Sequence, residues 1–248
     1  MTTLGIGPEA RRRLGARRTA EIVADELRRH HLPVRNKLLL CGPPGSGKTL
    51  SAEVIARELR LPLLTAKVDV LISSLLGQTA LNLRRLFEYG ARRPCVLFLD
   101  EFDALGRSRT DNGEHNELRR VVNSLLGMID RFGNRSILIA ATNLDDALDD
   151  AIWRRFDDVV QFGRPDAADI RRHLDILFKN YPVNFDVASV VPKLAGLTHA
   201  DIERVALDAI KTSILRKRKA VTETDVAASI KYQTRRTPNP ARARRTRS

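Results

Sequence analysis

The sequence has 248 residues, which is enough for a full α/β core and one small additional domain. Its hydrophobic content of 43% and charged content of 29% are ordinary for a globular protein. No run of about 18 apolar residues occurs and no signal peptide opens the chain, so we expect no membrane span and no secreted protein.

The net charge of +13 is concentrated at the two ends of the chain. Seven basic residues and no acidic residue follow residue 225, and the first 20 residues carry five arginines and one glutamate, which leaves +2 for residues 21–225. Such basic ends can bind nucleic acid, an acidic partner or a membrane surface, or they can remain solvated. For residues 234–248 we expect a disordered tail, because prolines and arginines offer nothing to bury.

Cysteines and histidines indicate the compartment and exclude one kind of metal enzyme. Cys41 and Cys95 both fall on predicted interior strands, where we expect small buried thiols in a reducing compartment, the cytoplasm, and no disulfide. The sequence contains no H-E-x-x-H pattern and no Cys/His cluster, so we expect no zinc protease within this chain.

The phosphate-binding pattern G-x-x-x-x-G-K-[ST] stands early in the chain, after an amphipathic segment over 20–30 that is predicted to be helical. An apolar strand over 37–41 precedes the pattern and a helix over 49–60 follows it, which is the context that the motif requires. We expect its residues, together with the next one, to bind a nucleoside triphosphate: Gly42, Pro43, Pro44, Gly45, Ser46, Gly47, Lys48, Thr49 and Leu50.

The chemistry of this loop follows from its residue types. Glycines allow successive backbone N–H groups to point at a polyphosphate, and the helix that follows adds its positive N-terminal end. Lys48 would bridge the β- and γ-phosphates, and the hydroxyl of Thr49 would be a ligand of Mg²⁺.

A carboxylate pair follows the third predicted strand. After a strand over 63–68 and a helix over 79–92, the strand over 95–99 runs directly into Asp100 and Glu101. Its unbroken apolar character predicts a parallel strand covered on both faces, whose carboxyl end faces the ligand crevice. Asp100 would then hold Mg²⁺, and Glu101 would be the general base that activates water.

A polar amide ends the fourth strand. After a helix over 117–129, the strand over 135–140 leads into Thr142 and Asn143. The Asn143 side chain can hydrogen-bond the γ-phosphate or the attacking water without adding charge, although an Asn after a strand is usually a turn former. A fifth strand is predicted over 159–162.

The sequence after residue 166 is predicted to be helical throughout, with helices over 167–179, 186–194, 199–216 and 222–233. Strand–helix alternation followed by helices alone predicts an α/β three-layer sandwich with a parallel sheet and an all-helical C-terminal lid. We expect four parts: a basic N-terminal segment (1–36), a P-loop ATPase subdomain (37–164), a helical lid (165–233) and a basic tail (234–248).

Across roughly residues 20–230 the chain resembles the AAA-type ATPases of the AAA+ superfamily, in a compact, single-ring, bacterial-looking form. Residues 42–49 resemble Walker A, 96–101 resemble a hydrolysis-competent Walker B, and Thr142-Asn143 resembles sensor 1. The resemblance implies a P-loop fold, ATP as the nucleotide, Mg²⁺ as the cofactor and hydrolysis of ATP to ADP and phosphate.

The resemblance also implies assembly into a ring, most commonly a hexamer. Arg154-Arg155-Phe156-Asp157 resembles the segment from which the family supplies arginines to the neighbouring subunit's nucleotide. Residues 128–132 resemble the intersubunit signalling segment, with Arg131 in place of the usual glycine, and residues 196–202 resemble the lid signature that ends in Ala-Asp-Ile. Because an adjacent pair on a helix points about 100° apart, the two arginines should differ in role.

The use of ATP turnover is the point on which alternatives stay open. Leu75, Leu76 and Gly77 match the family's pore loop, but a leucine stands where protein translocases present an aromatic residue, and plain packing of the leucines is an equal alternative. The family implies remodelling or unfolding of a protein client. The alternatives are an ATP-dependent switch that activates a partner enzyme such as a protease, and a ring that acts on nucleic acid through the basic ends. Other AAA+ branches place an arginine early in the third lid helix, where this sequence has Ala200, with Arg204 one turn later; this difference favours the AAA branch over the DNA-loading branches.

Overall fold

The computed structural model describes residues 35–73, 76–107, 115–143 and 150–236. These residues form two compact units, a sheet unit and a helical unit, with the main division of the chain after Phe162. The expected helix over 20–30, Leu75, and residues 237–248 of the basic tail expected over 234–248 lie outside the described residues. Residues 234–236 of that expected tail belong instead to a helix. No helix among the described residues is long and apolar enough to cross a membrane.

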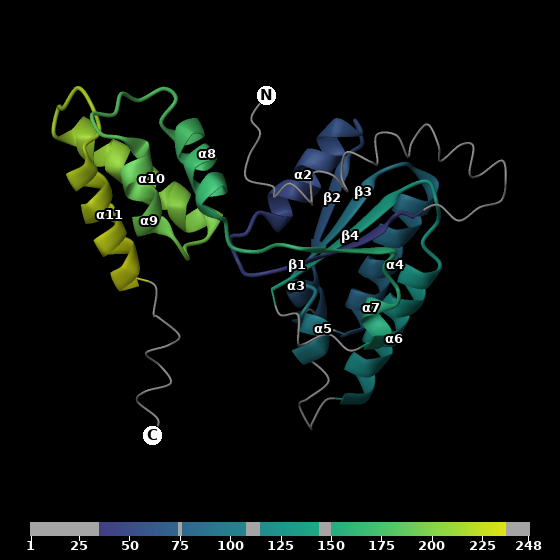
Figure 1. The fold of residues 1–248 in the computed structure, drawn as a ribbon. Helices are drawn as coiled ribbons and strands as arrows, with labels where there is room; N and C mark the ends of the chain where they lie inside the picture. The colour runs from purple at the N-terminus through teal and green to yellow at the C-terminus, as the bar shows by residue number, and fades with distance from the viewer. Residues whose placement is uncertain (1–34, 74–75, 108–114, 144–149, 237–248) are drawn as a thin grey trace, which may run out of the picture. The chain divides into compact units, whose positions relative to one another are not determined.

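The sheet unit is built on five strands, all of which pair in parallel (Figure 1). The order across the sheet is β2-β3-β4-β1-β5. The strands are β1 (Lys37–Cys41), β2 (Leu63–Lys67), β3 (Val96–Asp100), β4 (Ile137–Thr142) and β5 (Asp158–Gln161). The α/β class predicted from the strand–helix alternation is therefore confirmed.

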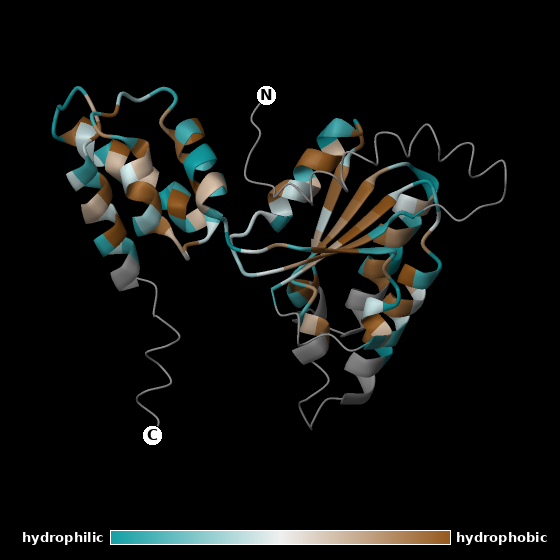
Figure 2. Ribbon diagram, in the orientation of Figure 1, coloured by the Kyte–Doolittle hydropathy of each residue, from teal (hydrophilic) through white to brown (hydrophobic). Residues whose placement is uncertain are grey.

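Helices cover both faces of the sheet, as a parallel sheet requires. The helices of this unit are α2 (Lys48–Glu58), α3 (Val68–Ser73), α4 (Leu76–Arg92), α5 (Ala104–Arg107), α6 (His115–Asp130) and α7 (Asp150–Trp153). Figure 1 shows α2 on one side of the sheet and α4 and α6 on the other. Leu39, Leu97 and Leu138 belong to the cluster that includes the buried faces of α4 and α6, and the alternate strand residues are buried as well. The central strands are accordingly hydrophobic along most of their length (Figure 2).

The strands β3 and β4 start later than the sequence pattern predicts, because a side-chain hydroxyl takes the place of a backbone hydrogen-bond partner at the start of their pairing. The hydroxyl of Ser136 accepts a hydrogen bond from the backbone N–H of Cys95 at 3.1 Å and donates one to the carbonyl of Gly90 at 2.5 Å. The regular pairing of β3 with β4 therefore begins at Val96 and Ile137. Both cysteines are buried and form no disulfide, and burial raises the pKa of the Cys95 thiol.

The helical unit consists of four helices around a separate apolar cluster. They are α8 (Ala167–Leu177), α9 (Val187–Leu194), α10 (His199–Leu215) and α11 (Glu223–Arg236), so α11 ends three residues beyond its predicted end. The N-termini of α8, α9 and α10 are capped by Asp166, Asp186 and Thr198, and the last cap is a reciprocal capping box with Asp201.

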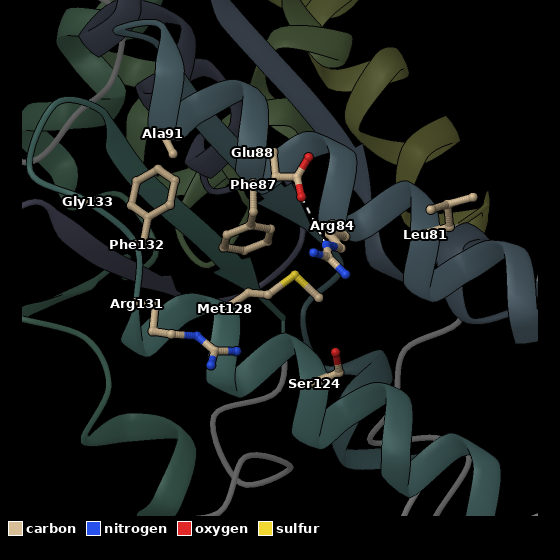
Figure 3. Close-up of a pocket in the computed structure, with 10 residues that line it drawn as sticks. All are labelled: Leu81, Arg84, Phe87, Glu88, Ala91, Ser124, Met128, Arg131, Phe132 and Gly133. Atoms are coloured by element: carbon tan, nitrogen blue, oxygen red, sulfur yellow. Dashed lines mark hydrogen bonds and ion pairs between the residues drawn. The ribbon is translucent and has the colours of Figure 1, made fainter.

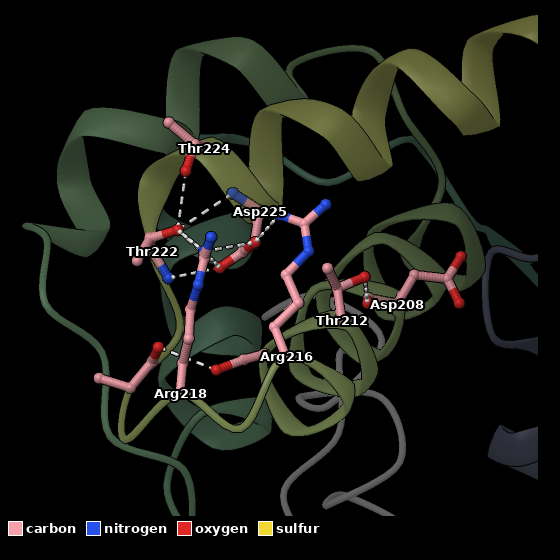
Figure 4. A network of polar contacts seen from close by, with 9 residues as sticks. Asp208, Thr212, Arg216, Arg218, Thr222, Thr224 and Asp225 are labelled. Atoms are coloured by element: carbon pink, nitrogen blue, oxygen red, sulfur yellow. Dashed lines mark hydrogen bonds and ion pairs between the residues drawn. The ribbon is translucent and has the colours of Figure 1, made fainter.

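A polar network at the start of α11 fixes the connection from α10 (Figure 4). The buried carboxylate of Asp225 accepts from the backbone N–H of Thr222 at 3.1 Å, from its hydroxyl at 2.6 Å and from Arg218 at 3.0 Å. Burial by itself would raise the pKa of Asp225, but the hydrogen bonds of Thr222 and the charge of Arg218 outweigh it and lower the pKa.

Candidate functional site

The phosphate loop leaves β1 through a glycine that no other residue could replace without strain. Gly42 has a φ of +145°, and a Cβ atom at this position would lie 2.2 Å from the carbonyl oxygen of Phe162. Gly47 has a φ of +101°, and no atom of the described residues would lie within 4 Å of a Cβ at this position. The backbone before Lys48 is therefore curled and open on one side, which is what a loop that receives phosphates requires.

Lys48 is the first residue of α2 and is only 7% exposed. Its ammonium group donates to the carbonyls of Gly42 at 2.7 Å and Pro43 at 3.0 Å, and to Oδ1 of Asn143 at 2.7 Å. Two residues that stand 95 positions apart in the sequence thus meet at the carboxyl ends of β1 and β4, the adjacent strands of the sheet. Two backbone carbonyls and an amide oxygen thus hold the ammonium group at the phosphate loop.

Thr49 and Asp100 offer two oxygen ligands for a magnesium ion. The hydroxyl of Thr49, at the start of α2, lies 3.5 Å from Oδ2 of Asp100, at the end of β3. No group of three or more His, Cys, Asp or Glu residues in the described ranges is arranged to hold a metal. A hydroxyl and one carboxylate fit Mg²⁺, which is usually held by one or two protein oxygens together with phosphates and water.

Glu101 adopts an unusual backbone conformation, with a φ of +55°. Its N–H donates to Oδ1 of Asp100 at 2.9 Å, which ties the two carboxylates of the motif together. The pKa of Glu101 is raised, first by a hydrogen bond shared with the carboxyl group of Asp69, then by burial and by the negative charges of Asp69 and Asp100, while Lys67 opposes the shift. The carboxyl group of Asp69, in α3, thus makes Glu101 easier to protonate.

The arginine pair follows α7, and its two members have different surroundings. The guanidinium of Arg155 lies 3.2 Å from the carboxylate of Asp130 and also donates to the carbonyl of Ala151. Arg154 is exposed, and the described part of the chain offers it no ion-pair partner. Among the described residues neither arginine forms an ion pair with Asp100 or Glu101, so the structure does not bring the pair into the same chain's site.

The residues beside the arginines anchor them to the core. The ring of Phe156 packs edge-to-face on the ring of Phe102, with centroids 5.7 Å apart and planes at 86°. The carboxylate of Asp157 accepts from the backbone N–H groups of Asn36 and Lys37, each at 2.8 Å. Because Phe102 directly follows Glu101, the arginine segment and the carboxylate segment share one packed contact.

Met128, Arg131 and Phe132 of the segment 128–132 line a groove between α4 and α6 (Figure 3). The groove has a volume of about 660 Å³. Phe132, at its floor, is buried within its own unit, and its ring packs edge-to-face on Phe87 at 5.6 Å. Arg131, which replaces the expected glycine, lies at the edge beside Met128 (Figure 3). This groove belongs to the α4–α6 face, whereas the phosphate loop lies at the carboxyl ends of the strands.

The remaining residues to place are those of the pore-loop pattern and three aspartates that contact residues of the site. Leu76 and Gly77 of the pore-loop pattern are the first residues of α4. Asp69, Asp103 and Asp130, which contact Glu101, Asn143 and Arg155, were missed, since each partner stands 25 to 40 residues away in sequence. For Asp103 alone the sequence gives a local hint, because this second aspartate stands two residues after the Asp100-Glu101 pair.

Comparisons with known proteins agree with this geometry. Residues 38–164 match the model of the family described as "ATPase family associated with various cellular activities (AAA)". An uncharacterized AAA family ATPase of Sinorhizobium fredii is 57% identical over 219 residues, which are 88% of this chain and 66% of that protein. ATP-dependent zinc metalloproteases named FtsH are 36% identical in Rhodococcus erythropolis, over 78% of this chain, and in Halothermothrix orenii, over 81%.

The chain spans only part of these relatives, namely 24% and 33% of the two FtsH proteins. The matched region contains the phosphate loop, the carboxylate pair and Asn143, which are the groups that the structure gathers at one edge of the sheet. The family model covers residues 38–164 of 248. The chain therefore belongs to the AAA family of ATPases.

Proposed function

We propose that the chain hydrolyses ATP at the edge of the sheet where Lys48, Thr49, Asp100, Glu101 and Asn143 converge, and that it does so within a ring of identical subunits. The observation that carries the proposal is the pair of contacts across that edge: Lys48 to Asn143 at 2.7 Å and Thr49 to Asp100 at 3.5 Å. They bring a phosphate-binding cation, an amide and magnesium-type oxygen ligands to one place.

Each group has a role in the transfer of the γ-phosphoryl group to water. Lys48 binds the β- and γ-phosphates, and Thr49 and Asp100 hold Mg²⁺, whose charge offsets that of the phosphate oxygens. Glu101 accepts a proton from water as the water oxygen forms its bond to phosphorus, and the bond from the γ-phosphorus to the bridging oxygen breaks to release ADP. Asn143 orients the water or the γ-phosphate without adding charge.

The arginines would complete the site of the neighbouring subunit. The transferred group carries negative charge that a positioned guanidinium stabilises, and such an arginine contributes about 10³–10⁵ in rate. The exposure of Arg154, and the absence of any bond from it to the same chain's site in the described residues, support a role in trans. Arg155, held by Asp130, would support the segment or sense the neighbour.

The ring, most simply a hexamer, would use ATP turnover to remodel or unfold a protein client. The FtsH relatives, named as ATP-dependent proteases, support work on proteins. Leu75, Leu76 and Gly77 would line the pore. Changing Leu75 to Ala tests this: loss of client processing with intact ATPase supports threading, and unchanged processing contradicts it.

A switch that activates a partner enzyme is the second candidate, because the FtsH relatives are named as ATP-dependent zinc metalloproteases and this sequence has no H-E-x-x-H pattern. Binding of nucleic acid by the basic ends is a third. Size measurement with and without an ATP analogue, followed by capture of partners with the Glu101→Gln variant, separates them. Assembly that ignores nucleotide would contradict the ring proposal.

A further inference from the structure

The segment after β3 returns to β4 beyond the end of their regular pairing. The two strands pair as far as Leu99 and Ala140. The chain then turns at Glu101, with its φ of +55°, and the N–H of Phe102 donates to the carbonyl of Ala141 at 2.8 Å. The residue that follows, Asp103, is thereby brought next to the end of β4.

Asp103 contacts the backbone of Asn143 from this position. Its side chain is only 1% exposed, and its Oδ1 accepts the N–H of Asn143 at 3.3 Å. Asn143 is itself exposed and is the first residue after β4, so the strand ladder no longer determines its orientation. A buried carboxylate is unfavourable unless N–H groups satisfy it, and a bond to an ionised acceptor is stronger than a neutral one.

We propose that Asp103 is a positioning residue for hydrolysis, which acts by fixing the backbone of Asn143 so that its amide stays directed at Lys48 and the γ-phosphate. The inference rests on the proposed role of Asn143. The chain of contacts runs from Asp103 to Asn143 at 3.3 Å and from Asn143 to Lys48 at 2.7 Å. Asp103 itself contacts neither nucleotide nor water in this scheme.

Loss of the Asp103 carboxylate should affect the chemical step more than nucleotide binding. The phosphate loop and Lys48 keep their own contacts to Gly42 and Pro43, so affinity for ATP depends little on Asp103. A misoriented Asn143 lowers the fraction of bound ATP that is ready to react, and misplacement by about 1 Å can cost up to ~10²-fold in rate. A purely structural Asp103, which only stabilises the turn before α5, would instead lower the melting temperature and leave kcat of the folded protein unchanged.

The test compares single and double variants of the full chain by kcat, by affinity for an ATP analogue and by melting temperature. Asp103→Ala is expected to lower kcat about 10- to 100-fold with an affinity change below about twofold. Asp103→Asn keeps an acceptor oxygen and is expected to restore most of kcat. Asp103→Ser, whose side chain is too short to reach Asn143, replaces the Ala variant if that variant does not fold. Asp225→Ala, which removes a buried carboxylate in the helical unit, is the control that lowers the melting temperature without lowering kcat.

The double variant with Asn143→Ala decides the route of the effect. If Asp103 acts through Asn143, adding Asp103→Ala to Asn143→Ala lowers kcat no further. Three results would each overturn the inference while leaving the role of Asn143 standing. They are a double variant whose loss of kcat is the product of the two single losses, an Asp103→Asn variant as slow as Asp103→Ala, and an unchanged kcat in Asp103→Ala. Unchanged kcat in Asn143→Ala would overturn the proposed role of Asn143 itself, and the inference with it.

Discussion

The carboxylates at the end of β3 lie side by side but are expected to do different work. Asp100 faces Thr49, as a magnesium ligand would, whereas Glu101 turns away through a positive φ and interacts with Asp69. This difference follows from one backbone turn between adjacent residues. It predicts that the two positions respond differently to removal of their negative charge.

Glu101→Gln should retain ATP and lose turnover by about 10²–10⁴-fold, because glutamine keeps the shape of the side chain but cannot accept the proton of water. Asp100→Asn should instead reduce the dependence of ATP binding on Mg²⁺, since it removes a ligand charge. Equilibrium binding of a fluorescent ATP analogue with and without Mg²⁺, next to single-turnover hydrolysis, separates the two outcomes. Full turnover by Glu101→Gln would remove Glu101 from the role of general base.

Among the elements, α8 and α10 are joined by a contact that depends on pH. Nδ1 of His173 lies 3.3 Å from Nδ1 of His199, and His173 is only 3% exposed. Burial and then the neighbouring His199 lower the pKa of His173 to about 4, and burial lowers the pKa of His199, with Asp169 opposing. Both rings are therefore neutral in the folded protein at pH 7, and one can donate to the other.

This pair should make the helical unit acid-sensitive. A histidine whose folded pKa lies below its unfolded value of about 6.5 contributes stability above pH 6.5, and that stability is lost as the pH falls toward about 4. His173→Phe, which keeps a ring but cannot be protonated, should show a smaller loss of melting temperature between pH 7 and pH 4.5 than the unmodified chain does. NMR titration of His173 gives the pKa directly, and a value at or above 6.5 would contradict this account.

The contribution of the Thr222 cap at the start of α11 to stability can be tested by mutation. Thr222→Ala removes the hydroxyl that bonds Asp225 and should lower the free energy of unfolding by about 1 kcal/mol, the usual cost of losing an N-terminal cap. Thr212→Ala is the matched control, because that hydroxyl bonds the carbonyl of Asp208 four residues back in the same helix, which adds little stability (Figure 4). Denaturant unfolding of the two variants measures the difference, and equal losses would show that the cap contributes nothing special.

For the whole molecule, the sequence predicted those features that are encoded within a few neighbouring residues. Apolar runs gave the strands, and Gly42–Thr49 gave the phosphate loop. The approach of Lys48 to Asn143 could be inferred from the rule that ligands bind at the carboxyl ends of parallel strands. The contacts of Glu101 with Asp69 and of Arg155 with Asp130 could not, because they depend on how α3 and α6 pack onto the sheet, and no local pattern reports such packing.

The proposed sharing of one active site by two copies of the chain can be tested by mixing variants. Lys48→Ala subunits should fail to bind ATP but still present Arg154, whereas Arg154→Ala subunits should bind ATP and lend no arginine. In a random equimolar mixture, about a quarter of the interfaces would combine an intact site with an intact Arg154, so hydrolysis should reappear although each variant alone is inactive. A control mixture in which Lys48→Ala/Arg154→Ala subunits replace the Lys48→Ala subunits should stay inactive, because no subunit then supplies Arg154. Arg155→Ala should lower kcat less than Arg154→Ala, since Asp130 already holds Arg155 at 3.2 Å. Inactivity of every mixture, or full activity of a dilute monomer, would contradict a site completed by the neighbouring subunit.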